Sequence, residues 1–298
     1  MLAVANYSMK GPFQAIIAIC ILSMLSVVIA PIGILVGAII ALVTLRISVA
    51  EGFKALIWGA VSHVALTVML SGNYWPGMIA VFEYMLPVWL MSIVLRQTNS
   101  LAHTLQFAMI IAGLGVIGFH LIVPNPAEWW LALFNQHVAP ALEAAEVVYQ
   151  PDVIAELAKM VTMLLAVFAV MLWFSILTLG RWWQSALYHS GQFQSDFYQL
   201  RLPKSTAYAA IALAVIGLVS GEPTGLVYDL SGVVIVGLMF QGIAIAHQTM
   251  SIKQLNKAWL AGLYILLFLF PQTMLILATI GLVDTWVDFR NRWEKEEL

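Results

Sequence analysis

Four ionisable residues lie inside long apolar stretches, where little water is available to stabilise a charge: His63, Glu83, Lys159 and Asp229. Such groups are costly at bilayer depth, so each is a candidate for ligand binding or proton transfer. At about 1.5 Å per helical residue, His63 lies about 18 Å from the inner end of its stretch, and Glu83 about 12 Å from the outer end of the next. In an apolar core about 30 Å thick, both side chains are expected at one level.

Lys159 enters its stretch from outside by about 9 Å, close to the level of Glu83. A pair between Glu83 and either Lys159 or His63 would offset the desolvation of each charge. The structural alternative is a protonated, hydrogen-bonded Glu83, with Lys159 reaching outward beside Glu156. Asp229 falls near the beginning of its helix, where the helix dipole stabilises a carboxylate without any further role.

The turn Asn73-Tyr74-Trp75 joins the stretches that carry His63 and Glu83. An aromatic pair beside an amide can stack on a small organic ligand and orient it, which predicts an outer substrate site. The alternative is an ordinary turn with aromatic residues at the membrane interface. The predicted substrate-binding residues are Asn73, Tyr74, Trp75, Glu83, His63 and Lys159.

The composition of the chain sets the context for these groups. Of its 298 residues, 62% are hydrophobic and 9% charged, and the mean hydropathy is +0.94. Soluble domains have about 45–50% apolar and about 25% charged residues, so a water-soluble fold is excluded. The net charge of −2 gives no basic surface for nucleic acid. The single cysteine, Cys20, excludes an intrachain disulfide and a cysteine-built metal site.

Nine apolar stretches predict helices that span the membrane, and the lipid bilayer is therefore the first expected partner. Proline disfavours helix for the residue before it, which separates the first two stretches at Ala30-Pro31. We predict an all-α, polytopic transmembrane bundle of eight or nine spans, with its first helix retained rather than cleaved as a signal peptide. The stretches are residues 13–30, 32–46, 52–71, 76–95, 102–123, 153–180, 206–220, 225–248 and 258–283.

Basic residues fall on one side of this arrangement. The loops predicted outside, around 72–75, 124–151 and 221–224, contain no Lys or Arg. The positive-inside rule therefore favours a cytoplasmic N-terminus. The loops predicted inside carry Arg46, Lys54, Arg96, Arg181, Arg201, Lys204, Lys253 and Lys257.

The C-terminal tail is the exception, because nine crossings would place Arg290, Arg292 and Lys295 outside. Pro271 divides the last apolar stretch, so residues 258–289 form either a ninth crossing or a re-entrant pair that keeps the tail inside. We favour the re-entrant pair and leave the crossing as the alternative.

Several short patterns are assigned to packing rather than chemistry. Gly113-Leu114-Gly115-Val116-Ile117-Gly118 matches a dinucleotide fingerprint only as text, since no strand precedes it and no acidic residue follows at the required distance. We interpret it, with the pairs Gly33/Gly37 and Gly217/Gly221, as small-residue seams between helices. His103, His120 and His247 lie near span ends, and no histidine spacing resembles a metal site. No catalytic motif is present, so neither an enzyme nor a cofactor is expected.

Three segments resemble the YybS-like family of uncharacterised bacterial membrane proteins. They are Phe197-Tyr198-Gln199-Leu200-Arg201-Leu202-Pro203-Lys204, Gln241-Gly242-Ile243-Ala244, and residues 280–290. The likeness covers nearly the whole chain and implies a bacterial inner membrane, but no established activity. The first six spans look similar to the substrate-binding S components of energy-coupling factor vitamin transporters. Those proteins dock an energising subunit through small residues at four-residue spacing, which only Ser26 and Ala30 keep here.

The sequence thus predicts an S-component-like half at residues 1–180, a cytoplasmic loop at 181–204 and a three-span half at 205–298. We expect it to bind a small metabolite, as part of a transporter energised by a partner protein or as a sensor. The alternative is a non-transporting scaffold that docks a partner protein through its inner loop and its C-terminal tail. Binding of anionic headgroups is the simpler explanation of the same basic residues. The docking residues would be Arg181, Arg201 and Lys204.

Overall fold

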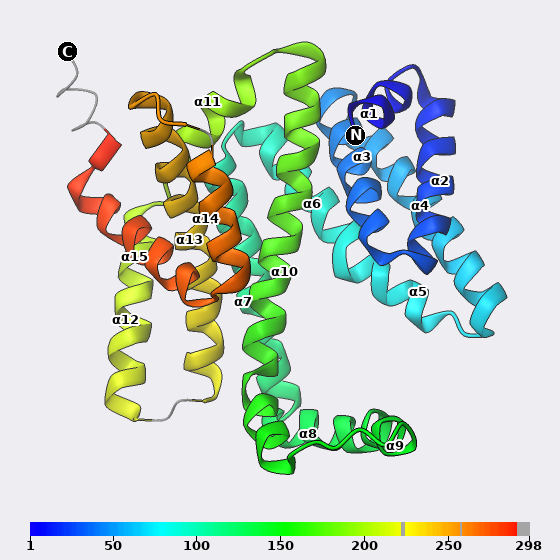
Figure 1. The fold of residues 1–298 in the computed structure, drawn as a ribbon. Helices are drawn as coiled ribbons and strands as arrows, with labels where there is room; N and C mark the ends of the chain where they lie inside the picture. The colour runs from blue at the N-terminus through cyan, green and yellow to red at the C-terminus, as the bar shows by residue number, and fades with distance from the viewer. Residues whose placement is uncertain (222–223, 257, 291–298) are drawn as a thin grey trace. The chain divides into compact units, whose positions relative to one another are not determined.

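The computed structural model describes residues 1–221, 224–256 and 258–290, and every regular element in these ranges is helical (Figure 1). The predicted all-α fold class is confirmed. The roles predicted for Lys257, Arg292 and Lys295 fall outside the described residues.

Five helical stretches are long and apolar enough to cross a membrane, which identifies a membrane-spanning protein. Four are α4 (Val49–Ser71), α7 (Leu101–Ile122), α10 (Pro151–Tyr188) and α13 (Leu226–Ile252). The fifth joins α5 (Trp75–Ala80), the π-helical turn η2 (Val81–Met85) and α6 (Leu86–Thr98).

Shorter apolar helices occupy the other predicted spans. They are α2 (Pro12–Val28), η1 (Ala30–Ile32) with α3 (Gly33–Arg46), α12 (Lys204–Ser220), α14 (Ala258–Leu269) and α15 (Gln272–Val287). The remaining helices are α1 (Leu2–Ser8), α8 (Pro126–His137), α9 (Ala139–Ala144) and α11 (Gln192–Tyr198). The predicted inner loop at 181–204 is thus largely helical, because α10 continues to Tyr188 and α11 follows it.

Turn chemistry ends the helices where the sequence indicates. The Ser48 hydroxyl accepts a hydrogen bond from the backbone N–H of Glu51 at 3.1 Å and caps α4. Gly72 (φ 68°) and Asn99 (φ 50°) end α4 and α6 in the left-handed conformation that these residue types tolerate best. These caps fix both ends of the helical hairpin between residues 48 and 99.

Close contacts divide the chain into two compact units. Unit 1 comprises Met1–Ala108 and Met171–Leu200, and unit 2 comprises Met109–Val170 and Arg201–Leu298. This division differs from the predicted boundaries, which follow the order of the chain. It differs because α7 and α10 each begin in one unit and end in the other.

Unit 1 has its core around α3, where 11 of the 14 residues are buried. Small residues allow this close packing. A Cβ on Gly37 would lie 2.6 Å from the Ile176 side chain, and one on Gly33 would lie 3.0 Å from the Tyr84 hydroxyl. The seam predicted for Gly33 and Gly37 is therefore confirmed.

Unit 2 is organised by α13 and α15, which approach each other at two glycines. A Cβ on Gly242 would lie 2.1 Å from the Leu277 carbonyl oxygen, and one on Gly281 would lie 2.2 Å from that of Leu238. Backbone in van der Waals contact leaves no room for a side chain.

The other predicted seams are wrong within unit 2. Gly217 meets nothing within 4 Å, and Gly221 instead ends α12 with φ 65°. Of the three glycines in the fingerprint-like run, only Gly113 meets a neighbour, the Leu230 side chain at 3.6 Å.

The last apolar stretch is divided at Pro271, between α14 and α15. At about 1.5 Å per residue, the two helices are about 18 and 24 Å long, too short for two full crossings. Figure 1 shows α15 (red) running back towards the end of the unit at which α14 (orange) begins. The number of times residues 258–289 cross the membrane, and with it the favoured re-entrant pair, stays a prediction.

Candidate functional site

The predicted outer turn is folded on itself. The Asn73 side-chain oxygen accepts a hydrogen bond from the backbone N–H of Trp75 at 3.0 Å, and this bond stabilises the turn. The rings of Tyr74 and Trp75 stack, with centroids 5.2 Å apart, and both are exposed. These three residues line none of the three cavities described below.

His63 is buried in unit 1 against α2. Its Nδ1 lies 3.0 Å from the Ser23 carbonyl oxygen and 3.1 Å from the Ser26 hydroxyl. A carbonyl can only accept, so Nδ1 carries the proton. Two serines of α2 thereby satisfy Nδ1 of the imidazole.

Glu83 lies on the π-helical turn η2 and its side chain is exposed. Its backbone carbonyl accepts a hydrogen bond from the Trp173 indole N–H. Within the described part of the chain its carboxylate has no hydrogen bond or ion pair, so the expected pair with His63 does not form. The single-residue insertion of a π turn often occurs at functional sites.

Lys159 follows the structural alternative. Its ammonium group forms an exposed ion pair with Glu156 at 2.5 Å, one helical turn earlier in α10. A pair with Glu83 would join the two units and stays a prediction.

An acid–imidazole pair that the sequence does not reveal lies in unit 2. The Asp229 Oδ2 lies 2.7 Å from Nε2 of His120, and the side chains are 3% and 14% exposed. Asp229 does lie in the first turn of α13, as predicted, but its partner is 109 residues away. The other oxygen, Oδ1, is buried and accepts no hydrogen bond among the residues described.

Aromatic residues pack beside this pair. Phe119, next to His120 in the chain, contacts Trp129 and Trp130, with ring centroids 5.4 and 5.6 Å apart. The Trp130 indole N–H donates to the Thr162 hydroxyl at 2.9 Å, which fixes α8 to α10.

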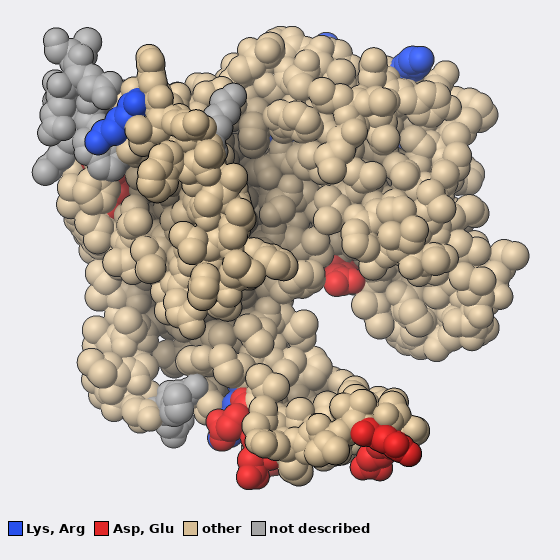
Figure 2. All heavy atoms as spheres, viewed as in Figure 1, with Lys and Arg blue, Asp and Glu red and all other residues tan. Residues whose placement is uncertain are grey.

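This bond closes one side of a cavity of about 410 Å³ between α8 and α10, here called the outer cavity. Almost all of its wall is apolar, and His137 contributes an imidazole to the lining. Acidic side chains gather over α8, α9 and the beginning of α10, beside this cavity (Figure 2). It is lined by Trp130, Leu133, Phe134, His137, Val138, Ile154, Leu157, Ala158 and Val161. A further cavity of about 560 Å³ lies between α12, α13 and α15 and is also mainly apolar.

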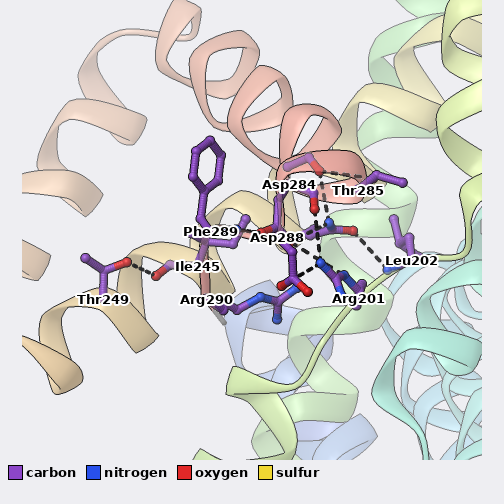
Figure 3. A network of polar contacts seen from close by, with 11 residues as sticks. Arg201, Leu202, Ile245, Thr249, Asp284, Thr285, Asp288, Phe289 and Arg290 are labelled. Atoms are coloured by element: carbon purple, nitrogen blue, oxygen red, sulfur yellow. Dashed lines mark hydrogen bonds and ion pairs between the residues drawn. The ribbon is translucent and has the colours of Figure 1, made fainter. Parts of the chain in front are cut away.

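A polar cluster lies at the other end of unit 2 and joins the segment before α12 to α13 and to the end of α15 (Figure 3). Asp284, fully buried, accepts from Arg290 at 2.8 Å and from the Gln241 amide at 3.3 Å. The Gln241 amide also bonds the Leu202 N–H and the Gly281 carbonyl, both at 2.9 Å. We call this the inner network: Arg201, Gln241, Asp284, Asp288 and Arg290.

Arg201 brings the inner loop to the end of α15. Its guanidinium lies 2.8 Å from the Asp288 carboxylate and 3.8 Å from that of Asp284. Asp284 and Arg290 form the buried part of this network, whereas Arg201 and Asp288 are about one-third exposed; a buried charge needs such a partner to offset its desolvation. Because Arg201 precedes α12, the end of α15 lies on the same side of unit 2 as the inner loop.

The residues predicted to dock a partner are largely engaged within the chain. Arg181 donates to the Asp196 carboxylate at 2.6 and 3.0 Å, and Arg201 belongs to the inner network. Lys204 is exposed and has no ion pair among the residues that the structure describes. Two of the three predicted docking residues therefore have ion-pair partners within the chain, and their docking role stays a prediction.

The described ranges contain no group of three or more His, Cys, Asp or Glu side chains that could hold a metal ion. Comparison with protein-family models, curated proteins and solved structures finds no match to this chain.

Proposed function

We propose that this membrane protein binds a small, largely apolar molecule in the outer cavity, between α8 and α10. The observation that carries the proposal is the cavity itself. Its volume of about 410 Å³ lies within the range of about 300–1,000 Å³ typical of ligand pockets.

The chemistry of the wall indicates the class of ligand. Leucine, isoleucine, valine and aromatic side chains favour an apolar body. The Trp130 N–H is already bonded to Thr162, so it holds the wall in place rather than the ligand. The His137 imidazole, also in the lining, would supply a polar contact for a hydroxyl or amide of the ligand.

The role in the cell follows the expectation from the sequence: a substrate-binding component of a transporter, or a sensor. Transport would need an energising partner, because the chain carries no nucleotide-binding motif. The distribution of Lys and Arg and the YybS-like resemblance support a bacterial inner membrane and a cytoplasmic N-terminus. The outer cavity would then open towards the external face.

A variant in which a tryptophan side chain fills the outer cavity tests the proposal. Val161→Trp places an indole in the outer cavity, whereas Leu164→Trp puts the same side chain on α10 at a half-exposed position that does not line it. Small molecules are extracted from the purified proteins and identified by mass spectrometry. We expect a molecule retained by the wild type to fall at least tenfold in Val161→Trp and to persist in Leu164→Trp.

Equal retention by the wild type and Val161→Trp would overturn the proposal. So would an extract in which bulk phospholipid is the only species, since the cavity would then be an ordinary lipid contact.

A further inference from the structure

A polar cavity lies in unit 1, at the ends of α3 and α6 and against α10. It measures about 270 Å³, and polar atoms form most of its surface. We call it the arginine cavity; it is lined by Leu45, Leu95, Arg96, Asn99, Arg181 and Gln184. None of its polar residues takes part in the outer cavity or the inner network.

Both guanidinium groups are held in place by the protein. Arg96 donates to the carbonyl oxygens of Thr44, Leu45 and Ile47 at 2.7, 2.9 and 3.1 Å, which caps the end of α3. Arg181 makes three further bonds, two to Asp196 and one to the Gln184 side-chain oxygen at 2.5 Å. A guanidinium has five N–H groups, so each arginine retains two that these bonds do not use.

The balance of charge at the cavity is positive. Asp196 neutralises Arg181. Among the residues that the structure describes, Arg96 bonds only to carbonyl groups, and the end of a helix carries about half a negative charge, which offsets its charge in part. No carboxylate lines the cavity. The amides of Asn99 and Gln184, the latter nine-tenths buried, add neutral donors.

Two fixed guanidinium groups that line one cavity and retain unused donors can hydrogen-bond a tetrahedral oxyanion, whose several oxygens each accept more than one bond. Basic pockets between spanning helices on the inner side bind phospholipid headgroups. The cavity lies where α3 and α6 end on the side predicted to be cytoplasmic.

We propose that the arginine cavity binds a phosphate group. Two sources supply this chemistry at the inner surface, an anionic phospholipid headgroup and a soluble phosphate compound. The site is separate from the outer cavity, so its test is independent of the proposed function.

Gln184→Glu is the decisive variant. The substitution keeps the size of the side chain and the oxygen that accepts from Arg181, but it adds a negative charge to the cavity wall. Gln194→Glu is the matched control, because it makes the same change on exposed α11, outside the cavity. Inorganic phosphate is titrated onto protein in neutral detergent, with sulfate and chloride for comparison. In parallel, phosphatidylglycerol or phosphatidylcholine nanodiscs are compared by native mass spectrometry for retained lipid.

We expect Gln184→Glu to weaken phosphate binding or phosphatidylglycerol retention at least tenfold, with a melting temperature equal to or above that of the wild type. Gln194→Glu should behave as the wild type does. Binding of inorganic phosphate without lipid selectivity assigns a soluble phosphate compound, and selective retention of phosphatidylglycerol assigns a headgroup. If neither probe distinguishes Gln184→Glu from the wild type, or if Gln194→Glu loses as much, the proposal is overturned.

Discussion

Arginines lie at the predicted inner end of both units, but their surroundings differ. In unit 2, Arg201 and Arg290 both form ion pairs with Asp284, and Arg201 also pairs with Asp288, so each arginine of the inner network has a carboxylate partner. In unit 1, Arg96 meets only backbone carbonyls, and a polar cavity remains beside it. A basic residue at the edge of a membrane therefore does not by itself indicate docking or binding. The number of carboxylates that fold against it decides which role remains.

The largest effect is expected where the network is most buried. Asp284→Ala leaves Arg201 and Arg290 with Asp288 as their remaining carboxylate in the network. Removing one partner of a buried ion pair costs about 3–5 kcal/mol, because the other charge stays desolvated. The free energy of unfolding in mixed micelles measures this loss. Glu156→Ala, which breaks an exposed pair on α10, should cost less than about 1 kcal/mol.

If Asp284→Ala unfolded with the same free energy as the wild type, the inner network would not hold α15 against the inner loop. The arginines of unit 2 would then not have the structural role that distinguishes them from those of unit 1.

A smaller effect is expected at the glycines that bring Gln241 to Gly281. Gly242→Ala forces a Cβ against the Leu277 carbonyl oxygen, whereas Gly217→Ala enters open space on α12. Overpacking costs about 1–3 kcal/mol, while alanine in an open helical position is stabilising by roughly 0.5–1 kcal/mol. Thermal unfolding of the two variants should therefore shift in opposite directions. A loss in Gly217→Ala equal to that in Gly242→Ala would attribute both to helix distortion rather than to the α13–α15 contact.

The helices were predictable because a run of about 20 apolar residues has few alternatives in a membrane. Pro31 and Pro271 mark real breaks, and α4 ends at Ser71, where the predicted stretch 52–71 ends. Contacts between distant segments were not predictable. His120 and Asp229 are 109 residues apart, and nothing in either local sequence distinguishes a paired side chain from an interfacial one.

The failure of the predicted pair of His63 and Glu83 has a specific cause. Depth follows from residue number at about 1.5 Å per residue, but contact also requires the correct rotation about each helix axis. His63 faces α2, where serines satisfy it, whereas the π-helical turn at Glu83 presents the carboxylate on an exposed face. An inserted residue of this kind changes the facing of side chains without changing their depth.

The last prediction tests whether Arg96, in the arginine cavity, contributes less to the stability of the fold than the inner network does. Arg96→Gln removes the bonds to the three carbonyls at the end of α3, which water reaches because Arg96 is exposed. We expect a loss of about 1 kcal/mol, since solvent replaces much of each bond. The free energy of unfolding is measured as for Asp284→Ala, with exposed Lys54→Gln as the control. A loss as large as that of Asp284→Ala would mean that Arg96 serves the fold as Arg290 does, and the distinction between the two inner ends would fail.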